Sequence, residues 1–251
     1  MAVFNSGSNA AIQLSTSSTI YGLVNSLSDM RPMSISAWVA PLVTGQGQKT
    51  IIAKMLNQGA GGTGGWHLLV TSLSGVRFER RYSVGITMRQ STNFSILTDG
   101  TYTHVGMVWN GDSAATSIRI FIGGSEAVYH SNLINGSAAF LTDVNYPTML
   151  FTVSDGTGRF GGEMSEVALW STTLSDVEIR LLSSSKVRGT PLQVRPDFLK
   201  LYLPLDDYPN RYINAGTGVY KDLSPSGLNG LNFKFFSLTN NATNILSYQP
   251  L

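Results

Sequence analysis

The chain has 251 residues and few charges: 17 lysine and arginine residues stand against 15 aspartate and glutamate residues, so 13% of the chain is charged, where soluble proteins average about 25%. The basic residues are scattered, the net charge is +2, and no apolar run approaches a membrane span. These features exclude a strongly phosphate-binding face and a transmembrane segment. There is no cysteine, which excludes disulfides and thiolate metal sites.

Short segments of alternating polar and apolar residues follow one another along the chain, separated by glycine, asparagine, aspartate and serine. In one of them Met33, Ile35, Ala37 and Val39 share a face by the two-residue period of a strand, and we expect this face to be core. The pattern predicts antiparallel sheets with one buried face each. The further predicted strands are 50–54, 66–71, 76–79, 104–109, 117–122, 148–151, 163–170 and 199–203.

One segment has helical spacing instead. Ser175 is placed as N-cap with Glu178 three residues later, as in a capping box, and Leu174 and Ile179 are spaced for a hydrophobic staple. We expect one short helix near 175–183, packed on an edge of the sandwich. Further apolar residues recur at helical spacing: Val177, Leu181 and Leu182.

The C-terminal quarter has a different texture, since six of the nine prolines follow Gly189. Proline disfavours regular interior strands. We therefore expect an extended tail with one strand at 199–203 and another near 231–238.

Several segments, taken in order, resemble the laminin-G-like, concanavalin-A-like jelly-roll family: Met33–Val39, Ile51–Lys54, Trp66–Leu68, Tyr102–Gly111, Ile120–Gly124, Phe160–Trp170 and Leu174–Ile179. The resemblance covers roughly residues 30–182 and implies an all-β, antiparallel jelly-roll sandwich. We expect Ala37, Trp38 and Trp170 to fill the space between the sheets. The residues that carry the motif are Trp38, His104, Trp109, Gly161, Gly162, Glu166, Trp170, Ser175 and Glu178.

The tail is similar to the end of short stand-alone laminin-G-like proteins encoded among phage and prophage structural genes, through residues 190–205 and 222–230. We therefore expect a laminin-G-like sandwich over residues 1–189. Residues 190–251 are expected to form a proline-rich extension that contributes a strand to the same sandwich.

Catalytic chemistry finds little support in the sequence. Glu163 and Glu166 are the first carboxylates to consider, but residues three apart on a regular strand point to opposite faces, whereas glycosidases need both carboxyl groups on one side of the sugar. His67, His104 and His130 stand apart from one another, without the spacing of metal ligands, and are interpreted as partly exposed strand histidines. We expect no catalytic residue.

Two kinds of binding site remain open. Calcium is the one cofactor candidate, at the turn residues Asp99 and Asp155, although aspartate is common in turns for other reasons. Sugar-stacking candidates are Tyr82, Tyr129 and Tyr146, in loop-like contexts on a neutral polar surface; tyrosines at sandwich rims also serve as loop anchors.

The resemblance and the low charge favour a non-catalytic structural protein of a phage virion, most plausibly a capsid decoration or cement protein. Its expected partners are capsid or other virion subunits and copies of itself, and its expected place is the virion, assembled in the host cytoplasm, because residues 1–6 lack the start of a signal peptide. One alternative is a lectin-like adhesin that binds glycans, and a second is a divergent glycoside hydrolase. Neither nucleic acid nor a membrane is an expected partner.

Overall fold

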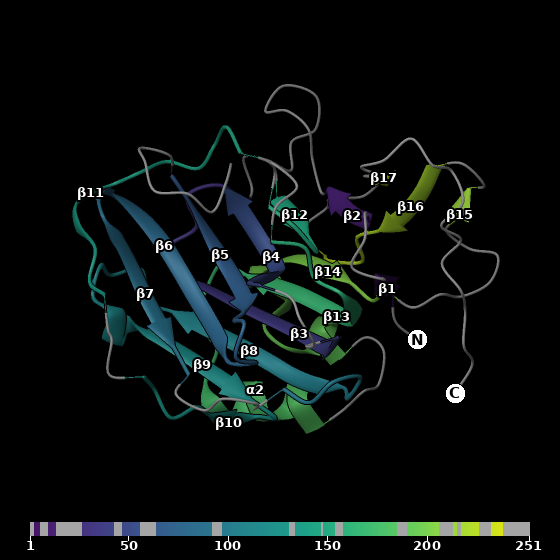
Figure 1. The fold of residues 1–251 in the computed structure, drawn as a ribbon, viewed down its shortest axis with the longest axis horizontal. Coiled ribbons are helices and arrows are strands. Elements are labelled where there is room, and N and C mark those ends of the chain that lie inside the picture. The colour runs from purple at the N-terminus through teal and green to yellow at the C-terminus, as the bar shows by residue number, and fades with distance from the viewer. Residues whose placement is uncertain are drawn as a thin grey trace.

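The computed structural model describes residues 3–5, 10–13, 27–42, 47–55, 64–91, 97–130, 134–146, 148–153, 158–184, 190–205, 213–214, 217–225 and 232–237. Within these ranges two antiparallel sheets are stacked face to face, with one α-helix outside one of them (Figure 1). The expected all-β jelly-roll sandwich with one short helix is confirmed. In the described ranges no helix is long and apolar enough to cross a membrane.

The first sheet has seven strands. Its order is β1 (Val3–Asn5), β13 (Gly162–Trp170), β3 (Met33–Pro41), β8 (Thr103–Trp109), β9 (Ile118–Ile122) and β10 (Ser125–Glu126), and β14 (Leu199–Leu203) also pairs with β13. β1 and β14 share one edge of β13, because β1 pairs with residues 162–164 and β14 with residues 167–170.

The second sheet has ten strands. Its order is β11 (Ser137–Phe140), β6 (Val76–Val84), β5 (Gly65–Val70), β4 (Lys49–Met55), β12 (Thr148–Leu150), β2 (Ala10–Gln13), β17 (Asn232–Ser237), β16 (Thr217–Lys221) and β15 (Ile213–Asn214), with β7 (Ile86–Gln90) beside β6. In Figure 1 its strands β4, β5 and β6 lie in front of the first sheet, and β15 to β17 lie at one end of the molecule.

The core fills the space between the two sheets. Met33, Ile35, Ala37 and Val39 are fully buried there, as the alternation predicts. Trp109 joins them, and its Nε1–H donates to the carbonyl of Asp112 at 2.8 Å. Because full burial of one large aliphatic side chain is worth about 1.5–3 kcal/mol, this inner layer is the main source of stability.

Two tryptophans lie on the other side of the first sheet from the one expected. Trp38 alternates with the core residues Ala37 and Val39, so it faces outward. Trp170 packs in a second apolar cluster on the outer face, where its Nε1–H donates to the carbonyl of Val194 at 2.7 Å. The expectation that both rings fill the space between the sheets is wrong, since a shift of one residue along a strand reverses the face.

The backbone conformation at the start of β13 requires a residue without a side chain. Gly162 has a φ of 128°, and a Cβ atom there would lie 2.2 Å from the carbonyl oxygen of Ala40. The close approach of β3 therefore requires glycine at this position.

Helix α2 (Asp176–Ser184) lies on the outer face of the seven-stranded sheet, against β8, and not on an edge as expected. Its buried residues are Ile179 and Leu182. Val177 and Leu181 are 69% and 47% exposed, so the apolar stripe expected from these two residues points to solvent. Apolar residues at helical spacing are buried only where they lie on the side of the helix that faces the sheet.

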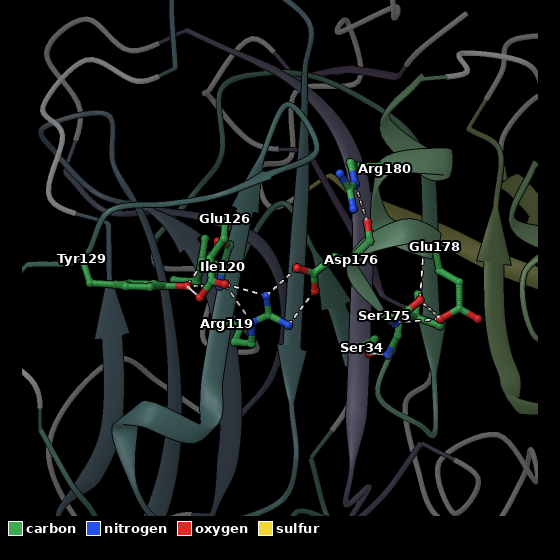
Figure 2. Close-up of polar contacts among 10 residues, drawn as sticks. Ser34, Arg119, Ile120, Glu126, Tyr129, Ser175, Asp176, Glu178 and Arg180 are labelled. Carbon is green, nitrogen blue, oxygen red and sulfur yellow. Dashed lines mark hydrogen bonds and ion pairs between the residues drawn. The ribbon is translucent and has the colours of Figure 1, made fainter.

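Two polar arrangements fix the start of the helix (Figure 2). The expected capping box is confirmed: the Ser175 N–H donates to Glu178 Oε2 at 2.7 Å, and the Glu178 N–H donates to Ser175 Oγ at 3.4 Å. Arg119 of β9 donates to both carboxylate oxygens of Asp176, at 2.7 and 2.9 Å, and pairs with Glu126 as well. The guanidinium group thus joins the helix to the β9–β10 hairpin.

The strands expected in the tail are both present. After the 3-10 turns η2 (Thr190–Gln193) and η3 (Pro196–Phe198), β14 pairs with β13 in the first sheet, and β17 pairs with β2 in the second. The division into a unit of residues 1–189 and an extension of residues 190–251 stays a prediction.

The capping box generates a prediction about stability. Replacing Ser175→Ala removes the hydroxyl that accepts the Glu178 N–H, so the free energy of unfolding should fall by about 1 kcal/mol in urea titrations. Ser184→Ala is the control, because that hydroxyl donates to the Leu181 carbonyl in the last helical turn. An equal loss in both variants would contradict the cap as the cause.

Candidate functional site

The centre of β13 is irregular and this irregularity builds the candidate site. A β-bulge lies within residues 165–168, and Glu166 has the left-handed φ of 52°. Met164 and Val167 are both buried in the core between the sheets, although they are three residues apart. The bulge therefore turns Glu163 and Glu166 to the same, outer face, and the expectation that they point to opposite faces is wrong.

One end of this face carries three half-buried residues, Tyr102, Glu163 and Ser165, together with the buried side chains of Trp38 and Glu166, and we name these five residues the outer strip. Glu163 stands opposite Ala40 of β3, and the small side chain of Ala40 lets the Tyr102 hydroxyl reach across it to donate to Glu163. Tyr102, Glu163 and Ser165 are each half-buried. The strip thus offers solvent a phenol, a carboxylate and a hydroxyl.

Trp38 connects the outer strip to a buried histidine. It stands opposite Ser165 on one side and His104 on the other. The rings of Trp38 and His104 meet edge to face, with their centroids 5.6 Å apart. The indole of Trp38 thus lies on the same outer face as Glu163 and Ser165.

The second carboxylate of the strip is nearly buried. The Tyr202 hydroxyl, on β14, donates to Glu166 Oε2 at 2.7 Å. The backbone N–H of Glu166 donates to the Pro204 carbonyl at 3.0 Å. The bulge, the left-handed backbone and β14 therefore hold this side chain in one position.

Each carboxylate of the strip accepts a hydrogen bond from a tyrosine. Burial and the bond to Glu163 raise the pKa of the Tyr102 hydroxyl, so it stays protonated and donates. A carboxylate oxygen has several acceptor positions, and the tyrosine occupies one of them. The strip can accept hydrogen bonds from ligand hydroxyls without any proton transfer.

Two histidines are fully buried, which corrects the interpretation of both as partly exposed. His104 Nε2 lies 2.8 Å from Ser36 Oγ, and His67 Nε2 lies 2.8 Å from Thr50 Oγ1. Burial lowers the pKa of each imidazole from 6.5 to about 3, and for His67 the positive charges of Arg77 and Arg81 add to the effect. Both rings are neutral at ordinary pH.

None of the three sugar-stacking candidates belongs to the outer strip. Tyr82 is buried inside β6, with its hydroxyl donating to the Asp112 carbonyl, so its expected loop position is wrong. The Tyr129 ring lies 3.3 Å from the guanidinium carbon of Arg89, and its hydroxyl donates to Glu126 at 2.7 Å (Figure 2). Tyr146 is half-buried. Tyr82 and Tyr129 thus make contacts within the protein through their rings or hydroxyls.

The calcium candidates do not converge in the described part of the chain. Asp99 lies in an exposed turn and its charge acts on Lys49, and Asp155 lies outside the described residues. Within the described ranges, no three histidine, aspartate or glutamate side chains gather as a metal site. The calcium site stays a prediction.

Sequence reasoning found Trp38, His104 and Glu166 as motif residues but not as neighbours on one face. It did not identify Tyr102 and Ser165 as members of the outer strip, or Tyr202 as the hydrogen-bond donor to Glu166. A signal was present in the apolar residues of β13, because Met164 and Val167 cannot both be core on a regular strand.

The buried histidines generate a prediction about pH. Between pH 6.5 and 3 the unfolded chain binds protons at His67 and His104 that the folded chain does not, so stability falls as the pH falls through this range. Each histidine contributes up to about 1.4 kcal/mol per pH unit. His104→Gln, whose amide can still bond Ser36, should flatten the dependence in urea titrations from pH 7 to 4. His130→Gln is the control, and an unchanged slope in His104→Gln would contradict the assignment.

Comparison with known proteins identifies the family of the chain and structures that share its fold. The family model of the concanavalin A-like lectin/glucanases superfamily matches residues 6–180. A candidate carbohydrate binding protein from Bacteroides ovatus is similar in structure, with a TM-score of 0.55 and 17% identity over 93% of this chain and 57% of that one. No curated protein sequence matches the chain.

A second similar structure is CBM40 of the Ruminococcus gnavus IT-sialidase, solved with bound α2,3-sialyllactose. Its TM-score is 0.52, with 14% identity over 72% of this chain and 96% of that one. At these identities the two structures show a shared fold. With the family model matching most of its length, the chain belongs to the concanavalin A-like lectin/glucanase superfamily.

Proposed function

We propose that this protein is a non-catalytic, lectin-like carbohydrate-binding protein and that the outer strip is its sugar site. The observation that carries the proposal is the grouping of Tyr102, Glu163 and Ser165, all half-buried, beside the ring of Trp38. They lie on the part of the outer face that is not occupied by the apolar cluster under helix α2.

The chemistry of these groups matches a saccharide. Sugar hydroxyls donate to carboxylate oxygens and exchange hydrogen bonds with a serine hydroxyl. The apolar C–H face of a sugar ring packs against an aromatic side chain, and the half-buried ring of Tyr102 is available for such a contact while its hydroxyl stays bonded to Glu163. Few precisely placed polar groups around an aromatic surface are typical of small-molecule sites.

The environment of the carboxylates favours binding over hydrolysis. Glycosidases use one protonated carboxyl as general acid and a second carboxylate as nucleophile or base. Here Glu163 and Glu166 each accept a proton-bearing tyrosine hydroxyl, from Tyr102 and Tyr202. In both pairs the glutamate oxygen is the acceptor and the tyrosine oxygen carries the shared proton.

The two similar structures described above support a carbohydrate partner through their own ligands or descriptions. Neither is described as a virion protein. The capsid decoration function, the virion localisation and the binding of capsid subunits therefore stay predictions, while the lectin-like alternative has the stronger support.

A matched pair of variants tests the sugar site. Glu163→Gln removes the negative acceptor of the strip and should weaken binding to the best glycan at least tenfold, about 1.4 kcal/mol, in isothermal titration after a glycan-array screen of the full chain. Glu126→Gln is the control, because Glu126 also accepts a tyrosine hydroxyl, from Tyr129, but lies on β10. It should bind within about twofold of the original chain.

Three outcomes would count against the proposal. An array without any saccharide-dependent signal would remove the lectin-like function, and equal losses in Glu163→Gln and Glu126→Gln would remove the strip as the site. Hydrolysis of a β-glucan that disappears in Glu163→Gln would establish the hydrolase alternative instead.

A further inference from the structure

A second polar cluster lies on the outer face of the other sheet. His67 of β5 alternates with the core residues Trp66 and Leu68, so it faces outward, and it stands opposite Glu79 of β6. Arg77 and Arg81 flank Glu79 two positions before and after it, on the same face. Diagonal neighbours on a sheet lie within reach of long side chains, so both guanidinium groups can reach the surroundings of the imidazole.

The chain contains a natural comparison for His67. His104, on the other sheet, is equally buried, has a hydroxyl at the same 2.8 Å from Nε2, and has a pKa lowered to the same value of about 3. Among the residues that the structure describes, the buried Nδ1 atom of neither ring has a hydrogen-bond partner. What distinguishes His67 is the positive charge of Arg77 and Arg81 acting on it.

The charges around His67 determine which kind of ligand its Nδ1 atom could bind. Two guanidinium groups outweigh the single carboxylate of Glu79 in this cluster, so the local charge is positive and disfavours a metal cation at Nδ1 of His67. Arg77 has a buried Nε–H without an acceptor as well, although its terminal nitrogen pairs with Glu79 at 2.8 Å. A buried donor without an acceptor costs free energy, which a ligand that supplies acceptors would recover.

Solvent contacts this cluster at its edge, through Arg77 and Glu79. The side chains of Arg77 and Glu79 are 14% and 11% exposed, and Met88 and Gln90, their partners on β7, are half-buried. The deeper members, His67 and Arg81, are buried. A ligand of a few atoms therefore fits the approach better than a saccharide chain.

We propose that His67, Arg77 and Arg81 form a site for a small oxyanion, a carboxylate or a sulfate. The oxyanion accepts the Arg77 Nε–H and the Nδ1–H of the neutral His67, with Arg81 supplying further positive charge. Arginine is suited to such planar acceptors because its N–H groups form a fixed fork. The site is on the other sheet from the outer strip and does not depend on the proposed sugar binding.

The imidazole resonances of the full chain provide the test. Sodium acetate is titrated at pH 7 against sodium chloride at equal ionic strength, and the ring signals of His67 and His104 are followed by NMR. We expect a saturating shift of His67 with acetate, no such shift with chloride, and an unmoved His104. Further titrations with sulfate, glucuronate and glucose separate a free oxyanion from the acid group of a sugar, since glucose should have no effect at His67.

A pair of variants completes the test. Arg77→Gln should weaken acetate binding at least tenfold, and Arg180→Gln, on the exposed side of α2, should leave it unchanged. The position of the His104 signal shows in each variant whether the fold is intact, and the contrast between the two histidines in the original chain stands without any variant. Equal shifts of His67 and His104, or no shift of His67 with any of the anions, would overturn the proposal and leave a buried water as the partner.

Discussion

The β-bulge in β13 is the constraint on which the rest of the structure depends. β13 pairs with β3 along its length, and its other edge passes from β1 to β14 across the bulge. The extra residue lets Met164 and Val167 both enter the core, so the sandwich stays filled on either side of the change of partner. The same extra residue moves Glu166 outward, next to Tyr202. Pairing of the tail and construction of the outer strip are thus consequences of one local irregularity.

The position of the strip also follows from where the helix ends its contact with the sheet. A Cβ atom at Gly106 would lie 3.3 Å from Ile179 and from Phe121, so the absence of a side chain there lets α2 approach β8 closely. Arg119 holds the start of the helix in the same place through Asp176. The helix therefore occupies one half of the outer face, and Tyr102 and Glu163 lie on the other half.

Local patterns predicted those parts of the molecule that depend on local physics. The alternation of Met33 to Val39 placed one strand and its core face correctly, and the spacing of Ser175 and Glu178 gave the helix start, because caps and periods are properties of short segments. Alternation does not say which layer covers the second face, so Trp38 and Trp170 were assigned to the wrong side. Pairing between distant strands decides the neighbours of Tyr102 and Glu163, and such pairing has no signature within a segment of the sequence.

Several of the few charged residues form ion pairs between segments that are distant in sequence. Three such pairs are Arg80–Asp143, Arg119–Asp176 and Arg195–Glu178. The Arg80–Asp143 pair is fully buried. Replacing either residue with an uncharged one would leave the charge of the other uncompensated in the core. Charges used in this way hold elements together and do not form a field around the protein. With 13% charged residues and a net charge of +2, the chain has little long-range attraction for a highly charged polymer.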